Sequence, residues 1–153
     1  MSEKRVNIEN AKVIPRPDYV AVLESIKQAG FCPFCKEHFE KHHTRPILFK
    51  NEHWFATENA WPYDGARHHF VIISLAHVEN AETLPAEAWA ALKDAYQYLV
   101  TTRTLAGATL LMRSGDTDFT GASVSHVHAQ VISGGPRSDD VEHINALVGF
   151  KHT

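Results

Sequence analysis

The chain has 153 residues, of which 44% are apolar and 22% are charged, proportions typical of one soluble globular domain. Lys and Arg number 15 against 18 Asp and Glu, a net charge of −3. This balance argues against stable binding to nucleic acid, which depends on neutralising phosphates. No segment approaches the roughly 18 apolar residues of a membrane span, and the polar first ten residues do not resemble a signal peptide. We therefore expect neither a membrane nor a nucleic-acid partner.

Residues 1–17 are expected to form an N-terminal arm, and residues 18–153 a single domain. Apolar spacing predicts a short helix over 18–28, ended by Gly30, and a longer helix over about 84–103. Strands in meander order beside two helices indicate an α+β fold with an antiparallel sheet. The strands are predicted over 47–50, 53–57, 69–74, 108–113 and 126–132, and a last short helix around 144–148.

The two cysteines are spaced as Cys32-Pro33-Phe34-Cys35. Two thiols cannot form a disulfide framework, and this spacing indicates a metal or redox role in a reducing compartment, hence the cytoplasm. His42 and His43 lie too close to the pair for a zinc finger, which needs about 12 residues between the second Cys and the first His. The order of elements does not match a thioredoxin fold, so a metal site and two reduced, packed thiols both remain open.

The segment from His126 to Ile132 alternates strictly between polar and apolar side chains. On a strand, one face would carry the side chains of His126, His128 and Gln130, and the other face would be apolar. Two imidazoles about 7 Å apart on a rigid element suit a metal ligand and a nucleophile side by side. A solvated sheet face is the simpler alternative.

Four segments together resemble the histidine-triad (HIT) superfamily. His126-Val127-His128-Ala129-Gln130 resembles its His-x-His-x-His motif, with Gln130 in place of the third His. Gly121-Ala122-Ser123 stands where the family has its Gly-Gln-Ser lead-in, and residues 69–77 resemble the family strand His-x-Leu-Val-Ile-Pro-x-x-His. The Cys-x-x-Cys of residues 32–35 resembles the one that opens many members. The resemblance implies an α+β HIT-like fold with about five antiparallel strands and two main helices.

Nucleotidyl transfer is the chemistry that this resemblance implies. His128 would attack the α-phosphorus of a nucleoside phosphate ester or anhydride and form a nucleotidyl-histidine, and Gln130 would contact the phosphoryl oxygens. Ser123 matches the phosphate-cradling position, and Asn59 lies near the ribose-binding position. We add Arg113 as a phosphate contact, because it ends the preceding predicted strand. The expected activity is that of a nucleotide hydrolase or nucleotidyltransferase.

The replacement by Gln130 resembles the galactose-1-phosphate uridylyltransferase and dinucleoside polyphosphate phosphorylase branches, in which an acceptor other than water takes the nucleotidyl group. A carboxamide has no titratable proton for the leaving group, so we expect a bias towards transfer. A nucleotide-binding regulator without turnover and a zinc-stabilised interaction module are the alternatives. Family members of this kind form homodimers through the long helix and an edge strand, for which the apolar surface would come from Trp89, Tyr96 and Leu99.

The resemblance also implies a structural zinc ion. Two cysteines and two histidines make an ordinary tetrahedral set for zinc, and the family positions map onto four residues of this chain. The alternative is that the thiols stay reduced and the histidines are hydrogen-bonded within the sheet. The implied ligands are Cys32, Cys35, His77 and His126.

Overall fold

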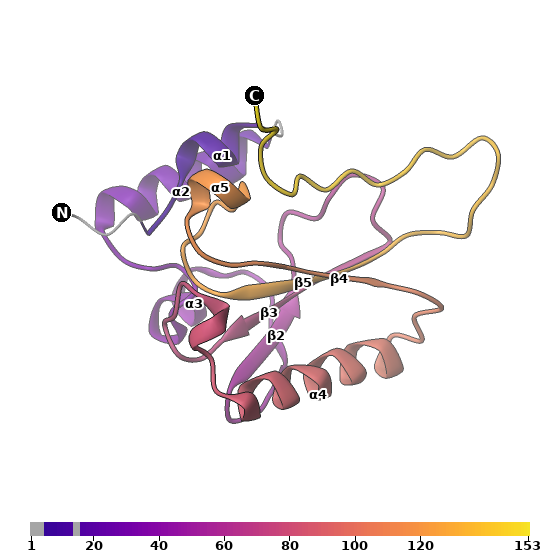
Figure 1. Cartoon of the computed structure of the whole chain (residues 1–153), viewed down its shortest axis with the longest axis horizontal. Coiled ribbons are helices and arrows are strands. Elements are labelled where there is room, and N and C mark those ends of the chain that lie inside the picture. Colours follow the sequence, from indigo (N-terminus) through magenta and orange to yellow (C-terminus); the bar gives the residue numbers. More distant parts are fainter. Residues whose placement is uncertain (1–4, 14–15) are drawn as a thin grey trace.

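A computed structural model describes residues 5–13 and 16–153. In this part of the chain the five strands form one antiparallel sheet in the order β1-β2-β3-β5-β4, which confirms the predicted α+β fold (Figure 1). No helix of these residues is both long and apolar enough to cross a membrane. The strands are β1 (Ile47–Lys50), β2 (Trp54–Glu58), β3 (His68–Ser74), β4 (Thr109–Arg113) and β5 (His128–Ser133). The helices are α1 (Ile8–Lys12), α2 (Pro17–Ala29), α3 (Lys36–His42), α4 (Ala86–Thr102) and α5 (Thr117–Thr120), with a 3-10 turn η1 (Ala81–Thr83).

Helix α4 covers one face of the sheet (Figure 1). Its apolar stripe packs on strand residues that include Trp54, whose indole Nε1–H donates to the Ala88 carbonyl at 2.7 Å. Leu99 is 0% exposed within this core. The expectation that Leu99 supplies a dimer surface is therefore wrong, because the α4 stripe is used by the chain's own sheet. Trp89, on the outer side of α4, is 44% exposed.

The opposite face of the sheet is covered in two parts. Phe39 of α3 packs against Phe55 and Ile73 of the sheet. Helices α1 and α2 form a separate apolar cluster that reaches Val124, just before β5. Asn10 of α1 also donates through Nδ2 to the Ala122 carbonyl at 2.7 Å. The N-terminal helices are thus attached to the loop that leads into β5.

Several sequence predictions need correction. Residues 144–148 form no helix. The Leu147 carbonyl accepts hydrogen bonds from the Arg113 guanidinium. The short helices α3 and α5 were not expected, since each buries a single residue, Phe39 or Thr117. The last strand begins at His128 and not at His126.

Candidate functional site

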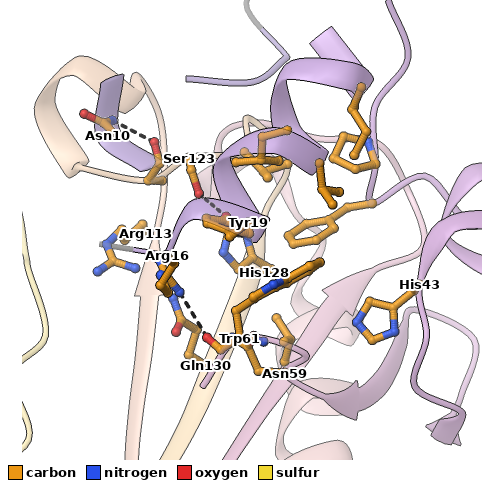
Figure 2. A pocket seen from close by; sticks show the side chains of 18 of the residues that line it. Asn10, Arg16, Tyr19, His43, Asn59, Trp61, Arg113, Ser123, His128 and Gln130 are labelled. Atoms are coloured by element: carbon orange, nitrogen blue, oxygen red, sulfur yellow. Dashed lines mark hydrogen bonds between the residues drawn. The ribbon is translucent and has the colours of Figure 1, made fainter. Parts of the chain in front are cut away.

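A pocket lies over the face of β5 that points away from α4, between the sheet and helix α2 (Figure 2). Ala129 and Val131 of β5 face the α4 core, so His128 and Gln130 point to the opposite side, as the alternation predicts. Both side chains line the pocket. Other residues that line it include Asn10, Arg16, Tyr19, Asn59, Trp61, Tyr63, Arg113 and Ser123.

The tautomer of His128 is fixed by the main chain. Its Nδ1 lies 2.7 Å from the His126 carbonyl oxygen, which can only accept, so Nδ1 carries the proton and Nε2 keeps its lone pair. Burial lowers the pKa of His128 to about 4, although the His126 hydrogen bond opposes this shift. The ring is therefore a neutral imidazole at pH 7, with Nε2 as its nucleophilic nitrogen.

A hydrogen-bond chain orients the Gln130 amide. The Tyr63 main-chain N–H donates to His69 Nδ1 at 3.0 Å, so the proton of this ring is on Nε2. His69 Nε2–H then donates to Gln130 Oε1 at 2.7 Å. The Gln130 carbonyl oxygen is thereby occupied, and its NH2 group is the part left to donate to a ligand. Asn59 lies beside this chain, with Nδ2 3.3 Å from His69 Nε2.

We expect His69 to be a positioning residue for Gln130. His69→Phe removes the donor that fixes the amide, and kcat should fall roughly tenfold, the effect of one lost hydrogen bond of about 1.4 kcal/mol. His69→Gln, which keeps an amide donor, should recover part of that loss, and His68→Gln is the control on the neighbouring residue. Equal kcat in wild type and His69→Phe would contradict this role.

The same contacts give a pH dependence. Burial lowers the pKa of His69 to about 4, below the unfolded value near 6.5. Between these values the unfolded chain binds the proton and the folded chain does not. The contribution of His69 to stability is therefore complete above pH 6.5 and is lost as the pH falls towards 4. Between pH 7.5 and pH 5.0, the free energy of unfolding measured by chemical denaturation should fall less for His69→Gln than for wild type.

The loop before β5 places Ser123 in the pocket. Gly121 ends α5 in the left-handed region, at a φ of +74°, which favours glycine. The Ser123 carbonyl accepts from the Asn7 main-chain N–H at 2.8 Å, and its hydroxyl hydrogen-bonds the Tyr19 hydroxyl. The loop is therefore held in place by the N-terminal segment.

Residues from outside the predicted motifs also form the pocket. Arg113, predicted as a phosphate contact, lines it, with its guanidinium bonded to the Leu147 carbonyl and, at 3.3 Å, to the Tyr63 hydroxyl. Arg16 and Tyr19 come from the start of α2 and had no signal in the sequence beyond their residue types, because that segment has no polar spacing that marks a site. Trp61 lines the pocket, whereas Trp54 faces α4.

Two cysteines and two histidines lie together outside the pocket lining, and the two residues between the cysteines, Pro33 and Phe34, line the pocket. One potential ligand atom from each cysteine and histidine lies within 4.8 Å of the others. Distances of 3.4 Å join Cys32 Sγ to His126 Nδ1 and Cys35 Sγ to His77 Nδ1, and the two Nδ1 atoms are 3.1 Å apart. Tetrahedral zinc with bonds of about 2.3 Å to sulfur and 2.05 Å to nitrogen requires S–N edges near 3.6 Å and N–N edges near 3.3 Å. The donor set fits zinc.

The surroundings of the histidines bear on the same fit. His126 Nε2 lies 2.7 Å from the Ser74 carbonyl, so this nitrogen carries the proton and Nδ1 offers its lone pair to a metal. His77 Nε2 lies 3.0 Å from Arg5 Nη1 and 3.8 Å from Glu79 Oε1. The Arg5 contact requires a lone pair on Nε2, whereas a metal on Nδ1 would require the proton on Nε2. With a metal bound, Glu79 would therefore be the hydrogen-bond partner of Nε2.

The metal-free thiols are poorly suited to redox chemistry. Burial raises the pKa of Cys35 to about 12, and the neighbouring Cys32 adds to the shift. Thiol–disulfide exchange requires a thiolate, and burial disfavours that form of Cys35. A zinc ion would supply the positive charge that stabilises two thiolates. The redox alternative for the Cys-x-x-Cys motif is therefore the weaker one.

No protein-family model matches the chain, and no curated protein is significantly similar to it. Solved structures do share its fold. A HIT family hydrolase from Clostridium thermocellum has a TM-score of 0.53 at 21% identity, over 65% of this chain and 90% of its own. A hypothetical histidine triad nucleotide-binding protein from Sulfolobus tokodaii has a TM-score of 0.54 at 18% identity, over 78% and 81%. A zinc-bound histidine triad family protein from Mycobacterium smegmatis has a TM-score of 0.52 at 15% identity, over 70% and 77%. The chain thus has the histidine-triad fold that its motifs predict.

Proposed function

We propose that this protein is a HIT-family nucleotide hydrolase or nucleotidyltransferase that cleaves the phosphorus–oxygen bond at the α-phosphate of a nucleoside phosphate. The observation that carries the proposal is the fixed tautomer of His128, whose unprotonated Nε2 shares a pocket with Ser123 and Gln130. The names of two proteins with the same fold, a hydrolase and a nucleotide-binding protein, support it.

In the first step His128 Nε2 attacks the α-phosphorus, and the bond from phosphorus to the leaving oxygen breaks. The ring then holds phosphorus on Nε2 and a proton on Nδ1, so it is positive, and the His126 carbonyl stabilises this charge. The Gln130 NH2 group and Ser123 donate to the non-bridging oxygens. Because Gln130 has no titratable proton, the leaving group departs as an anion or is protonated by water.

In the second step an acceptor takes the nucleotidyl group. The oxygen of water, a phosphate or a sugar phosphate attacks the phosphorus, and the phosphorus–nitrogen bond breaks. His128 Nε2 recovers its lone pair, and the proton of a water or hydroxyl acceptor passes to solvent. Water gives a nucleoside monophosphate, whereas another acceptor gives a transfer product. The proposed chemistry allows both outcomes, and the choice depends on the access of each acceptor to the intermediate.

The proposal is tested with zinc-loaded, full-length protein and a panel of nucleoside monophosphates, diphosphates, sugar nucleotides and dinucleoside polyphosphates. Thermal shifts identify ligands, and mass spectrometry of products and protein identifies cleavage and a nucleotidyl adduct. Cleavage at the α-phosphate with an adduct on the chain supports the proposal. Binding without turnover across the panel would make the protein a nucleotide-binding regulator, and no nucleotide affinity would favour a zinc-stabilised interaction module.

The Gln130 residue should favour transfer. With phosphate or a sugar phosphate added to the best substrate, we expect a transfer product in addition to the nucleoside monophosphate, because the Gln130 carboxamide can hold a phosphoryl oxygen of the intermediate until an acceptor captures it. Gln130→His should raise the rate with poor leaving groups, such as phosphoramidates, by roughly tenfold or more. Product analysis by mass gives the ratio. Free monophosphate as the sole product, with unchanged rates in Gln130→His, would leave simple hydrolysis.

Three further features belong to the proposal. One zinc ion per chain would be held by the Cys2His2 cluster. Its role would be structural, because it would fix the main chain beside His128. A homodimer is also proposed, through α4 and the edge strand β4, where Trp89 is 44% and Leu110 45% exposed. The cytoplasmic location stays a prediction.

A further inference from the structure

Two arginines enter the pocket without a carboxylate partner. The Arg16 guanidinium donates through Nη1 to the Trp61 carbonyl at 3.0 Å and lies 4.4 Å above the centre of the Tyr19 ring. Its Nε is buried and has no hydrogen-bond partner. A buried donor of this kind costs free energy unless a ligand or water satisfies it. The Arg16 guanidinium therefore keeps a hydrogen-bond donor that no described residue of the protein satisfies.

Arg113 is the second of these charges. Its hydrogen bonds go to the Leu147 carbonyl and the Tyr63 hydroxyl, both neutral acceptors. Among the described residues, no carboxylate forms an ion pair with Arg16 or Arg113. None of the described residues that line the pocket is Asp or Glu. The pocket thus holds two uncompensated positive charges, and a phosphate oxygen would be a stronger partner than either neutral acceptor.

Both arginines lie at the Gln130 end of the pocket. Figure 2 shows Arg16 and Arg113 on the side that holds Gln130, with His43 on the other side of His128. In the register of β4 against β5, Arg113 lies opposite His128, so its guanidinium also starts beside the nucleophile. The positive charges of Arg16 and Arg113 also lower the pKa of His69, the hydrogen-bond partner of Gln130, although burial is the larger cause. Both charges are therefore close to the amide that would contact the α-phosphate.

We propose that Arg16 and Arg113 form a second anion-binding subsite, which receives a phosphate group on the leaving side of the α-phosphate. This inference rests on the proposed function and narrows its substrate class to nucleoside diphosphates, polyphosphates and nucleotides whose leaving group carries phosphate. The subsite would stabilise the leaving group, which Gln130 cannot protonate. When the bond from the α-phosphorus breaks, the leaving phosphate keeps the electron pair, and the guanidinium groups neutralise its charge without transfer of a proton.

Binding measurements on the zinc-loaded full chain test the subsite. We expect wild type to bind a nucleoside diphosphate at least roughly tenfold more tightly than the monophosphate of the same base, as measured by calorimetry. Arg16→Gln should reduce this ratio towards one, and Arg16→Lys should keep part of it. Lys27→Gln is the matched control, because it removes one positive charge from the exposed side of the same helix. Arg113→Gln is the second variant, should Arg16→Gln fail to fold.

Inorganic pyrophosphate separates the subsite from the proposed function. If no nucleotide is bound or cleaved but pyrophosphate binds and is lost in Arg16→Gln, the subsite stands and the proposed function fails. If nucleotides are cleaved but the diphosphate preference is absent in wild type, or unchanged in both arginine variants, the subsite is overturned and the proposed function stands. An equal loss of monophosphate and diphosphate affinity in Arg16→Gln also overturns it.

Discussion

His128→Ala should reduce turnover on the best substrate by about a thousandfold or more, because it removes the nucleophile on which both steps depend. The fold should persist. The side chain lies on the pocket face of β5, and its loss removes one hydrogen bond and some packing against Phe34, a cost of about 1–3 kcal/mol. Steady-state kinetics and circular dichroism measure the two effects, with the exposed His143→Ala as the control.

A second measurement separates loss of the nucleophile from a disturbed pocket. The nucleotidyl adduct found by mass spectrometry of quenched wild-type protein should be missing from His128→Ala. His128→Gly with added imidazole should recover a measurable part of the turnover, because the free ring can occupy the vacated space and attack the same phosphorus. Near-wild-type turnover in His128→Ala, or an adduct on another residue, would rule out the covalent mechanism on His128.

The face of β5 on which each side chain lies could be predicted from the sequence, because it depends on local strand geometry alone. Side chains alternate across any strand, so the sequence places His128 and Gln130 on one face and Ala129 and Val131 on the other, without knowledge of the neighbouring strands. Helix α3 could not be predicted in this way. It has a single buried apolar residue, Phe39, so it lacks the repeated apolar spacing that indicates a helix. Packing against the sheet stabilises it instead.

Contacts between distant segments set the remaining parts of the site. The His69–Gln130 hydrogen bond depends on the register of β3 against β5, in which His69 lies opposite Ile132, and no local pattern specifies that register. Arg16 enters the pocket because α1 and α2 pack as one unit on the loop before β5. The predicted arm, residues 1–17, contains α1 and Arg16, and the helix predicted over 18–28 is α2; the sequence of neither gives a sign of where it packs.

The zinc site is expected to have the largest effect on stability. Purified wild type should carry about one zinc ion per chain, and Cys35→Ser should lose most of it, because it removes a thiolate ligand from the four-residue cluster. A metal that binds only the folded state, at a free concentration a thousand times its Kd, raises the free energy of unfolding by about 4 kcal/mol. For a chain of this size the melting temperature should then fall by roughly 10 °C. Metal analysis and calorimetry measure both quantities.

The zinc prediction also reaches the nucleophile. His126 would supply a metal ligand through Nδ1, and its carbonyl is the acceptor that keeps the proton of His128 on Nδ1. Loss of zinc would leave the His126 ring held through Nε2 by the Ser74 carbonyl but no longer fixed at Nδ1, so Cys35→Ser should lower kcat by more than the loss of folded protein explains. His38→Gln, beside the cluster but outside it, is the control and should keep its zinc. A zinc-free wild type from zinc-replete medium, with the same melting temperature as Cys35→Ser, would contradict the site and would leave the two thiols as packed, reduced side chains.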